Sequence, residues 1–416
     1  MKSRFRFLSF VVVAVMIALV STFSFAASKT SVHKKKDGKV SESTRARKHT
    51  RSTHKRKITA HKRAVPAHRR GRKTRVARAR RHHYRYVEHF YTSSFATDIT
   101  NGDQTAGEDA MVRQAALDAL GNYNGTMVAI DPTDGRILAM VNQKLALSEG
   151  AQPCSTIKLA VALAALSEGV ISRETEVSLG GRWHMNLTQA LAHSNNAYFE
   201  AVGRKLGFEK VSYYAHQFGL GELAGYHIQG EHLGVYPSTE LPAKLGGVGK
   251  MCSFGESISM TPLQLGALVS AIANGGTLYY LQHPTSPEQV QNFQPKIKRD
   301  LDIADVIPEM QDGMMGAVAY GTARSLRVNF NEEEILGKTG TCSKDGTRFG
   351  WFASYAKTDY GHIVTVVFLQ GGRPTYGPKA AEITGKFYRA LYDHNFFTAT
   401  AATQTPERTT TVGVQQ

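Results

Sequence analysis

The chain has 416 residues, of which 42% are hydrophobic, enough for one large globular domain or two ordinary ones. Its net charge of +17 is unevenly spread, because residues 1–86 hold 26 of the 51 Lys and Arg residues and only two acidic ones. Three cysteines without metal-ligand spacing exclude a disulfide scaffold and leave at least one unpaired within the chain. A basic arm therefore precedes a slightly acidic body, and neither a metal nor a cofactor is expected.

Residues 1–28 are typical of an export signal, in which three basic residues precede an apolar run at residues 7–25. Residues 24–26, Ser-Phe-Ala, offer a small-x-small cleavage site, which favours a signal peptide. The run is also just long enough to be a membrane anchor. Both alternatives predict an exported protein, in the periplasm or at the outer face of the cytoplasmic membrane.

Residues 29–86 are almost entirely Lys, Arg, His, Ser, Thr and Ala, with hardly an aliphatic side chain to bury. This composition predicts a basic disordered arm and linker over residues 29–105. A charge of about +21 over residues 29–86 predicts attraction to anionic lipid headgroups, wall polymers or lipopolysaccharide. The export signal argues against nucleic acid as the partner. Residues 397–416 form a second low-complexity tail.

The region between these tails, residues 106–396, alternates helical and strand patterns and is large enough for an independent core. An amphipathic helix is predicted at residues 108–120. The segments TMVAID and RILAMV follow, and the turn at residues 132–135 makes them a hairpin. Toward the other end, ILGKTGT, RFGWFASYA and HIVTVVFLQ predict three more strands, and a helix is expected at residues 378–394.

The middle of this domain is predicted to be helical, at residues 155–166, 187–206 and 261–274. The last helix has the clearest signals, because Thr261 can cap it and Pro262 fits its first turn. Strand segments from both ends of the domain enclose these helices. The arrangement predicts an α+β fold with one sheet assembled from both ends.

Candidate chemistry is carried by three short motifs: Ser155-Thr-Ile-Lys158, Ser194-Asn195-Asn196 and Lys338-Thr339-Gly340-Thr341. The Ser-x-x-Lys pattern also occurs at Ser31 and Ser52 in the basic arm, where no apolar helix follows. After Lys158 the segment LAVALAAL follows, so Ser155 is expected at the start of a buried helix. An N-cap serine beside a solvated lysine stays open as the alternative for this motif alone.

Lys158 is expected one helical turn after Ser155 and on the same helix face. An amine accepts a serine proton only when it is neutral, and burial or a nearby positive charge lowers its pKa. The apolar helix provides the burial, and Lys338 provides the charge if it converges on the site. The helix N-terminus also favours negative charge at the serine. The pattern therefore indicates a serine nucleophile with a lysine base.

The second and third motifs are predicted on a helix and a strand. Ser194 and Asn196 lie in a segment predicted to be helical, although adjacent Asn residues are poor helix formers. A hydroxyl that relays a proton and an amide that holds a peptide carbonyl would explain them, and a local helix break is the alternative. Gly340 lies on a predicted strand, where it suits either a closely approaching substrate backbone or a simple bulge.

In this order and on these elements, the motifs resemble the transpeptidase domain of penicillin-binding proteins, within the serine β-lactamase superfamily. Further segments are similar to that family: VAIDPTDGRILAM to its first hairpin, GESISMTPLQLGALVSAIANGGTL to its TPLQ helix, and YGTARSL, LGKTGTC and RFGWFASYA to its third-motif strand and following hairpin. The resemblance implies a β-lactamase/transpeptidase-like α+β fold, with an antiparallel sheet flanked by helices and a helical subdomain. It also implies a D,D-transpeptidase that cross-links peptidoglycan stem peptides and is acylated by β-lactams.

The resemblance assigns the catalytic roles residue by residue. Ser155 would be the nucleophile, Lys158 its general base, and Ser194 the proton relay toward the leaving amine. The backbone N–H groups of Ser155 and Thr341 would form the oxyanion hole for the tetrahedral intermediate. No metal or cofactor is implied.

The same resemblance assigns the substrate contacts. Asn196 would hold a substrate amide, and Lys338 would supply electrostatic stabilisation. Thr339, Gly340 and Thr341 would contact the substrate carboxylate and backbone.

The chain departs from the family's pattern at its cysteines. Cys154 stands where the family commonly has Gly before the serine, Cys342 follows Thr341, and Cys252 precedes FGES, a loop that borders the active site in relatives. The resemblance thus predicts that the three lie close together, and we expect a disulfide between two of them in an oxidising compartment. No glycosyltransferase domain or class B pedestal is recognised, and the basic arm occupies that place.

Two other functions stay open. A D,D-carboxypeptidase or a class D-like β-lactamase would share the fold, although class D enzymes usually carry valine where this chain has Asn196. A non-catalytic penicillin sensor, or a wall protein that binds polyanions through its arm, belongs to a different class.

Overall fold

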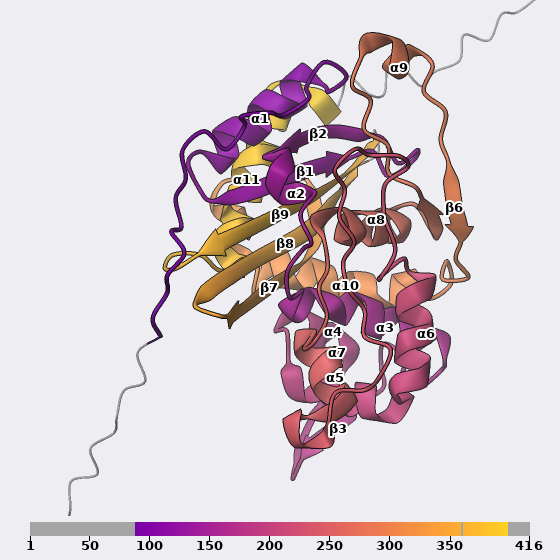
Figure 1. The fold of residues 1–416 in the computed structure, drawn as a ribbon. Helices are drawn as coiled ribbons and strands as arrows, with labels where there is room; N and C mark the ends of the chain where they lie inside the picture. The colour runs from indigo at the N-terminus through magenta and orange to yellow at the C-terminus, as the bar shows by residue number, and fades with distance from the viewer. Residues whose placement is uncertain (1–87, 359–360, 398–416) are drawn as a thin grey trace, which may run out of the picture. The chain divides into compact units, whose positions relative to one another are not determined.

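The computed structural model describes residues 88–358 and 361–397 (Figure 1). The predicted export signal, the basic arm up to residue 87 and the C-terminal tail beyond residue 397 lie outside these residues. In the described part of the chain, no helix is both long and apolar enough to cross a membrane.

A five-stranded antiparallel sheet lies at the centre, with the strand order β2-β1-β9-β8-β7. Its strands are β1 (Gly125–Ile130), β2 (Ile137–Val141), β7 (Glu334–Lys344), β8 (Thr347–Thr358) and β9 (Gly361–Gly371). The predicted hairpin β1–β2 joins the last strand of the domain, because Met127 pairs with Val367. Both ends of the domain therefore build one sheet, as predicted.

One face of the sheet is covered by α1 (Ala110–Leu120) and α11 (Gly377–Asp393), which contact each other and the strands (Figure 1). The short η3 (Arg324–Val328) packs against α11. The Asp109 carboxylate caps α1 by accepting the N–H groups of Met111 and Val112, at 3.0 and 2.9 Å. The apolar sides of α1 and α11 are buried here with side chains of β1, β8 and β9. This layer forms the first of two hydrophobic cores.

The other face is covered by α8 (Pro262–Ala273) and α10 (Ile307–Ala319), and beyond them lies a helical subdomain. Its helices are α3 (Lys158–Ser167), α4 (Leu187–Ala192), α5 (Asn196–Leu206), α6 (Phe208–Gln217) and α7 (Gly247–Phe254). Thr261 and Gln264 cap α8 reciprocally, which confirms its predicted start. Because almost every residue of α3 and α8 is buried, these two helices form the centre of the second core.

The remaining elements are short and connect these layers: α2 (Gln143–Ala146), η1 (Cys154–Ile157), β3 (Val177–Gly180), β4 (Trp183–Met185), η2 (Ala243–Leu245), β5 (Thr277–Tyr279), α9 (Pro287–Gln291) and β6 (Ile297–Asp300). Strands β3 and β4 pair with each other, as do β5 and β6. The fold is α+β, an antiparallel sheet flanked by helices with a helical subdomain, as the sequence predicted.

Two predicted helices differ from the structure. The helix expected from Ser155 begins instead as the 3₁₀ turn η1 and becomes α-helical only at Lys158. The helix expected over residues 187–206 is interrupted between α4 and α5, where Ser194 has a left-handed φ of 55°. A left-handed residue cannot continue a right-handed helix, so the local break considered as an alternative is present.

The predicted disordered linker was placed too far along the chain, because residues 88–105 lie against the sheet and α1. Tyr91 N donates to Gly346 O at 2.9 Å, and the buried Asp103 carboxylate accepts from Asn142 N at 3.0 Å and pairs with Arg113 at 2.9 Å. These residues are richer in aromatic and acidic side chains than the arm, and several of those side chains find partners in the domain. The rest of the predicted arm lies outside the described residues.

Candidate active site

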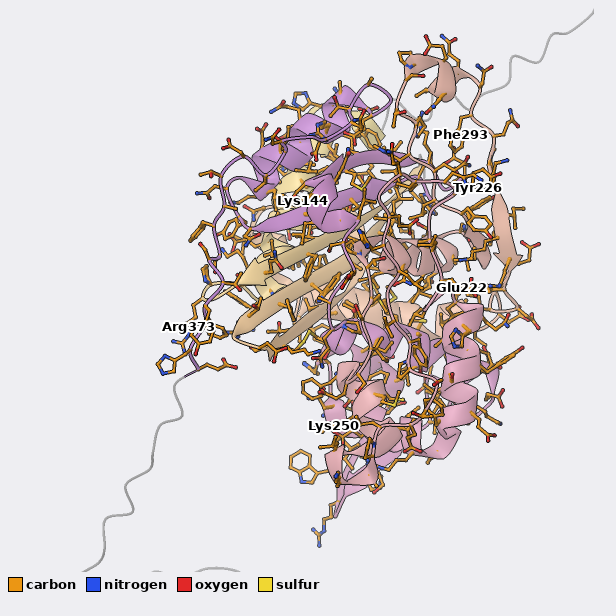
Figure 2. All side chains as sticks on the ribbon, viewed as in Figure 1. Lys144, Glu222, Tyr226, Lys250, Phe293 and Arg373 are labelled. Carbon is orange, nitrogen blue, oxygen red and sulfur yellow. A yellow bond between two sulfur atoms is a disulfide. The ribbon has the colours of Figure 1, made fainter. Side chains whose placement is uncertain are left out.

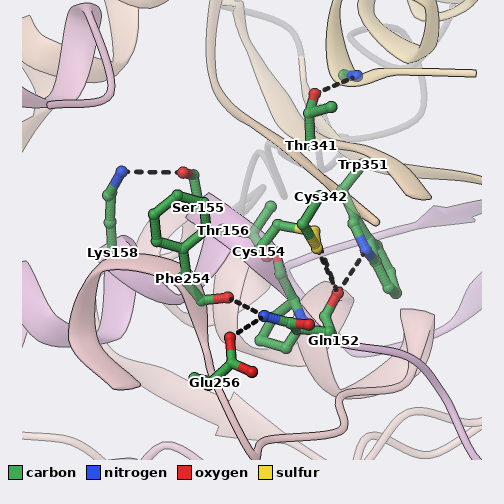
Figure 3. Close-up of a disulfide and its surroundings, with 12 residues drawn as sticks. Gln152, Cys154, Ser155, Thr156, Lys158, Phe254, Glu256, Thr341, Cys342 and Trp351 are labelled. Carbon is green, nitrogen blue, oxygen red and sulfur yellow. Dashed lines mark hydrogen bonds between the residues drawn. A yellow bond between two sulfur atoms is a disulfide. The ribbon is translucent and has the colours of Figure 1, made fainter. Parts of the chain in front are cut away.

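Ser155 and Lys158 meet where η1 passes into α3. Lys158 Nζ lies 2.9 Å from Ser155 Oγ, in hydrogen-bonding contact (Figure 3). The lysine is fully buried, and Ser155 is only 9% exposed. The expected juxtaposition is present, and the alternative of a solvated lysine is excluded.

The second motif converges on the same lysine through the break between α4 and α5. Lys158 Nζ donates to Ser194 Oγ at 3.1 Å, to the Ser194 carbonyl at 2.9 Å and to Asn196 Oδ1 at 2.6 Å. Asn195, between them, caps α5 by accepting the N–H of Tyr198 at 2.9 Å. The helix break therefore produces the contacts with Lys158, since the left-handed Ser194 turns its carbonyl and hydroxyl toward that lysine.

The third motif brings a second buried lysine to the site. Lys338 Nζ donates to Ser194 Oγ at 2.8 Å and to the carbonyl of Thr339 at 3.0 Å. Burial, and next the charge of Lys338, lower the pKa of Lys158 to about 6 against the opposing effect of Glu200. Burial lowers the pKa of Lys338 to about 7. Both predicted causes of a neutral Lys158, burial and a neighbouring cation, are present.

Gly340 has a different neighbour from the one expected. Its pairing with Trp351 continues the β7–β8 register without a bulge, which excludes that alternative. A Cβ built on Gly340 would lie 2.9 Å from the Pro153 carbonyl oxygen and 3.2 Å from Thr156 Cγ2. The glycine therefore lets β7 approach the turn that carries Ser155, and a contact between its backbone and substrate stays a prediction.

Side chains alternate along a strand, so Thr339 and Thr341 lie on one face of β7 and Lys338 and Gly340 on the other. Thr339 Oγ1 lies 2.6 Å from Thr322 Oγ1, and Thr341 Oγ1 accepts the N–H of Gly377 at 2.8 Å. Thr322, in the segment YGTARSL, was not selected from the sequence as a site residue. Its N–H donates to the carbonyl of Ala192 at 3.1 Å, so the α10–η3 turn links the second motif to the third.

These groups form a buried serine, two lysines of lowered pKa and a relay hydroxyl, an arrangement suited to acyl transfer through a serine ester. In the described residues, no group of three or more His, Cys, Asp or Glu side chains could hold a metal ion. Residues 125–389 match the family model of the penicillin binding protein transpeptidase domain. The chain belongs to this family.

Curated relatives of this transpeptidase domain include stage V sporulation protein D of Bacillus subtilis. It is 27% identical over 314 residues, which cover 63% of this chain and 48% of that protein. Peptidoglycan D,D-transpeptidase MrdA of Acinetobacter baumannii is 24% identical over 382 residues, covering 72% of this chain and 56% of the relative. The chain thus spans about half the length of the curated relatives it matches.

Solved structures share the fold of this transpeptidase domain. A peptidoglycan glycosyltransferase from Burkholderia ambifaria aligns with a TM-score of 0.58 at 20% identity, covering 69% of this chain and 98% of that one. PBP2 of Pseudomonas aeruginosa, solved in complex with WCK 5153, aligns with a TM-score of 0.57 at 22% identity, covering 69% and 74%.

The transpeptidase domain contains a disulfide beside its candidate nucleophile. Cys154 and Cys342 are bonded across 188 residues, with their Cα atoms 5.6 Å apart (Figure 3). Cys252, on α7, is free and buried. Two of the three cysteines are therefore bonded, as expected. Cys154 has a left-handed φ of 52°, a conformation that suits the glycine common in the family better than a cysteine.

Beside the disulfide, the transpeptidase domain has an open cavity of about 510 Å³. Its walls come from β7 and β8, from the helical subdomain where Figure 2 labels Lys250, and from the N-terminal segment at Glu88. Cys342 and Thr341 line it, whereas Cys154 does not. The cavity therefore borders the Cys342 side of the disulfide and the strand that carries the third motif.

Proposed function

We propose that this chain is a D,D-transpeptidase that forms peptidoglycan cross-links through an acyl-enzyme on Ser155. The observation that carries the proposal is the 2.9 Å contact between Ser155 Oγ and the nitrogen of the fully buried Lys158. With a pKa of about 6, this lysine is largely neutral at pH 7 and able to accept the hydroxyl proton. Ser155 then has the adjacent base that a serine nucleophile requires.

Acylation begins when Ser155 Oγ attacks the carbonyl carbon of a D-alanyl-D-alanine bond and its proton passes to Lys158. Negative charge develops on the carbonyl oxygen, where the N–H groups of Ser155 and Thr341 stabilise it. The proton then moves through Ser194 Oγ, 3.1 Å from Lys158 Nζ, to the departing amine. D-Alanine leaves, and the remaining peptide is an ester of Ser155.

Deacylation reverses these roles with a different nucleophile. An amine of a neighbouring stem peptide attacks the ester carbonyl and gives up a proton through Ser194 to Lys158. Ser155 Oγ leaves and recovers that proton, so the enzyme is regenerated and a cross-link is formed. The reaction requires that the amine reach the ester faster than water does.

Asn196 and Thr339 supply the substrate contacts. Asn196 Oδ1 accepts from Lys158 at 2.6 Å, which leaves its amide NH₂ to donate to a substrate carbonyl. On β7 the Thr339 hydroxyl is assigned to the terminal carboxylate of the donor peptide, and Lys338, the preceding residue, supplies electrostatic stabilisation. The partners are therefore peptidoglycan stem peptides and β-lactams, and the exported location expected from residues 1–28 gives access to both.

The decisive experiment incubates the protein with a D-Ala-D-Ala pentapeptide and an amine acceptor and measures transfer against hydrolysis. We expect the transferred product, release of D-alanine and a stable ester with labelled penicillin. The Ser155→Ala variant should lose both product and label, whereas Ser167→Ala, outside the site, should keep both.

Two outcomes would support the alternatives. Release of D-alanine without transfer at saturating acceptor would indicate a carboxypeptidase, and rapid turnover of nitrocefin would indicate a β-lactamase. A stable penicillin ester with no peptide turnover at all would favour the sensor.

A further inference from the structure

The two bonded cysteines stand next to the two predicted oxyanion donors. Cys154 precedes Ser155 in η1, and Cys342 follows Thr341 on β7. Each predicted N–H donor is therefore within one residue of a bonded cysteine. Because the cysteine Cα atoms are held 5.6 Å apart, the disulfide fixes the spacing of the two peptide segments that carry these donors.

Strand β7 packs against η1 through several non-covalent contacts, and the disulfide adds a covalent one. β7 is an edge strand that pairs only with β8 among the described strands. The non-covalent contacts include the close approach of Gly340, on β7, to the Pro153 carbonyl. The neighbouring strand β8 adds a hydrogen bond from Trp351 Nε1 to Gln152 O at 3.0 Å. The disulfide is the covalent part of this junction, and its Cys154 directly precedes the nucleophile (Figure 3).

The backbone at Cys154 indicates that its side chain is needed. A left-handed φ of 52° disfavours any residue with a Cβ, and this residue is completely buried directly before Ser155. Glycine would adopt the same conformation without strain but would form no bond to β7. The cysteine retains the conformation and adds a covalent link.

We propose that the Cys154–Cys342 disulfide is a positioning element for acylation of Ser155, and that its reduction by a dithiol slows acylation reversibly. The proposal rests on the function proposed above. Reduction leaves Ser155, Lys158 and Ser194 in place but frees β7 to move away from η1. Misplacement of a donor by about 1 Å is enough to cost a large factor in rate.

The cavity determines which sulfur a reductant reaches. Cys342 lines the 510 Å³ cavity and is partly exposed, whereas Cys154 is 0% exposed. A thiolate of the dithiol attacks Cys342 Sγ, and the S–S bond breaks with Cys154 leaving as a thiolate that takes up a proton. The second thiol of the reductant then attacks the mixed disulfide. Cys342 is released as a thiol, and the dithiol becomes a cyclic disulfide with two electrons transferred.

The test compares the oxidised protein, the protein reduced with dithiothreitol, and reduced protein that has been reoxidised. Acylation by a fluorescent penicillin is followed over a range of concentrations, so that the acylation rate constant is separated from the dissociation constant. We expect reduction to lower the acylation rate constant about tenfold or more. The effect should be smaller than the roughly 100- to 1000-fold loss caused by removing an oxyanion donor, because the donor is displaced and not removed. Because β7 also carries Thr339 and Lys338, the dissociation constant and the midpoint of the pH profile are measured beside the rate constant. Reoxidation should restore the rate.

Variants separate the disulfide from other thiol effects. Cys342→Ser should acylate as slowly as reduced wild type and should not respond to dithiothreitol. Cys252→Ser, which removes the free buried thiol, should behave as wild type in all three states. Thiol content is verified by mass spectrometry and folding by the thermal midpoint.

The possible results distinguish this inference from the proposed function. If the oxidised protein forms no penicillin ester, the proposed function fails. If it does, and fully reduced folded protein acylates at the same rate, the positioning role is wrong. Unfolding of the reduced protein at the assay temperature would also overturn it, because the disulfide would then serve stability alone.

Discussion

Lys158 and Lys338 share one hydrogen-bond acceptor, the hydroxyl oxygen of Ser194, at 3.1 and 2.8 Å. Two amines this close, both with 0% exposure, disfavour each other's charged state. Lys338 is thus part of the reason why the pKa of Lys158 falls to about 6. The acid limb of the pH–rate profile should report this arrangement.

Replacing Lys338 should move that acid limb. In wild type, acylation requires neutral Lys158 and should rise with pH around a midpoint near 6. Lys338→Gln removes a positive charge, so the pKa of Lys158 should rise and the midpoint should move to higher pH. Lys338→Arg, which keeps the charge, is the matched control and should not move it upward. The midpoint of each variant is measured from the rate of acylation by labelled penicillin between pH 4.5 and 9. A midpoint unchanged by Lys338→Gln would contradict the effect of the Lys338 charge on the pKa of Lys158.

Burial of Lys158 also makes stability depend on pH. Unfolded Lys158 keeps its proton up to its ordinary value of 10.5, whereas the folded residue loses it above a pKa of about 6. The unfolded state therefore binds one more proton in this window, and rising pH favours the folded state. Relative to Lys158→Met, the free energy of unfolding of wild type should rise by about 1.4 kcal/mol per pH unit between pH 7 and 9.

Denaturant unfolding at several pH values tests this slope. Lys386→Met, at an exposed position of α11, is the control and should show the same pH dependence as wild type. Parallel curves for wild type and Lys158→Met would mean that Lys158 stays charged in the folded protein.

Much of this arrangement follows from local sequence patterns. The helix at Thr261 has a cap, a first-turn proline and a long apolar run, and ILGKTGT begins with strand-forming residues, so the positions of both elements were predicted well. The three motifs were selected by their residue types and by their order on predicted helices and a strand. Lys158 lies one turn from Ser155 because residues three apart share a helix face, which needs no tertiary information.

Other features depend on contacts between distant segments. A helix break near Ser194 was an open alternative from the sequence, but the contact of its carbonyl with Lys158 from another helix was not predicted. Thr322 matters because a turn places it against Thr339, and no pattern within YGTARSL indicates that. The choice of Cys342 over Cys252 as the partner of Cys154 was likewise decided by the approach of β7 to η1.

Adding a methyl group at Gly340 should separate β7 from the nucleophile's turn. The new Cβ would lie 2.9 Å from the Pro153 carbonyl oxygen, so one of the two segments must shift. Overpacking of this kind costs roughly 1–3 kcal/mol of stability. We expect Gly340→Ala to slow acylation about tenfold or more, measured with labelled penicillin on folded protein.

Gly337 provides a control on the same strand. A Cβ there would lie 2.6 Å from the Phe352 ring, on the face covered by α11. Gly337→Ala should therefore lower the thermal midpoint while folded molecules acylate at the wild-type rate. Equal acylation rates for the two variants would show that Gly340 does not position the nucleophile.

The basic arm should act separately from catalysis. Residues 29–86 carry a charge of about +21, which should bind anionic vesicles at low salt and release them as ionic strength rises. Deletion of residues 29–86 should abolish sedimentation with phosphatidylglycerol vesicles and leave penicillin acylation unchanged. Vesicle binding that does not depend on salt would contradict an electrostatic role of the arm. A loss of acylation when residues 29–86 are deleted would contradict its separation from catalysis.

Thr322 should act on substrate binding through Thr339. Thr339 is only 4% exposed, and its hydroxyl lies 2.6 Å from Thr322 Oγ1, in hydrogen-bonding contact. Thr322→Val keeps the shape but removes the hydroxyl, so Thr339 loses the contact that orients it toward a ligand carboxylate. A hydrogen bond of this kind contributes about 1 kcal/mol, which corresponds to roughly a fivefold weaker complex.

Thr322→Ser keeps the hydroxyl and should bind as wild type does. Titration with penicillin before acylation separates the dissociation constant from the rate constant, and only the former should change in Thr322→Val. If Thr322→Ser binds as weakly as Thr322→Val, the methyl group and not the hydroxyl matters, and Thr322 then acts by holding the turn after α10. A midpoint of the acid limb that stays near pH 6 in both variants would place their effect on the carboxylate side of the site, away from Lys158.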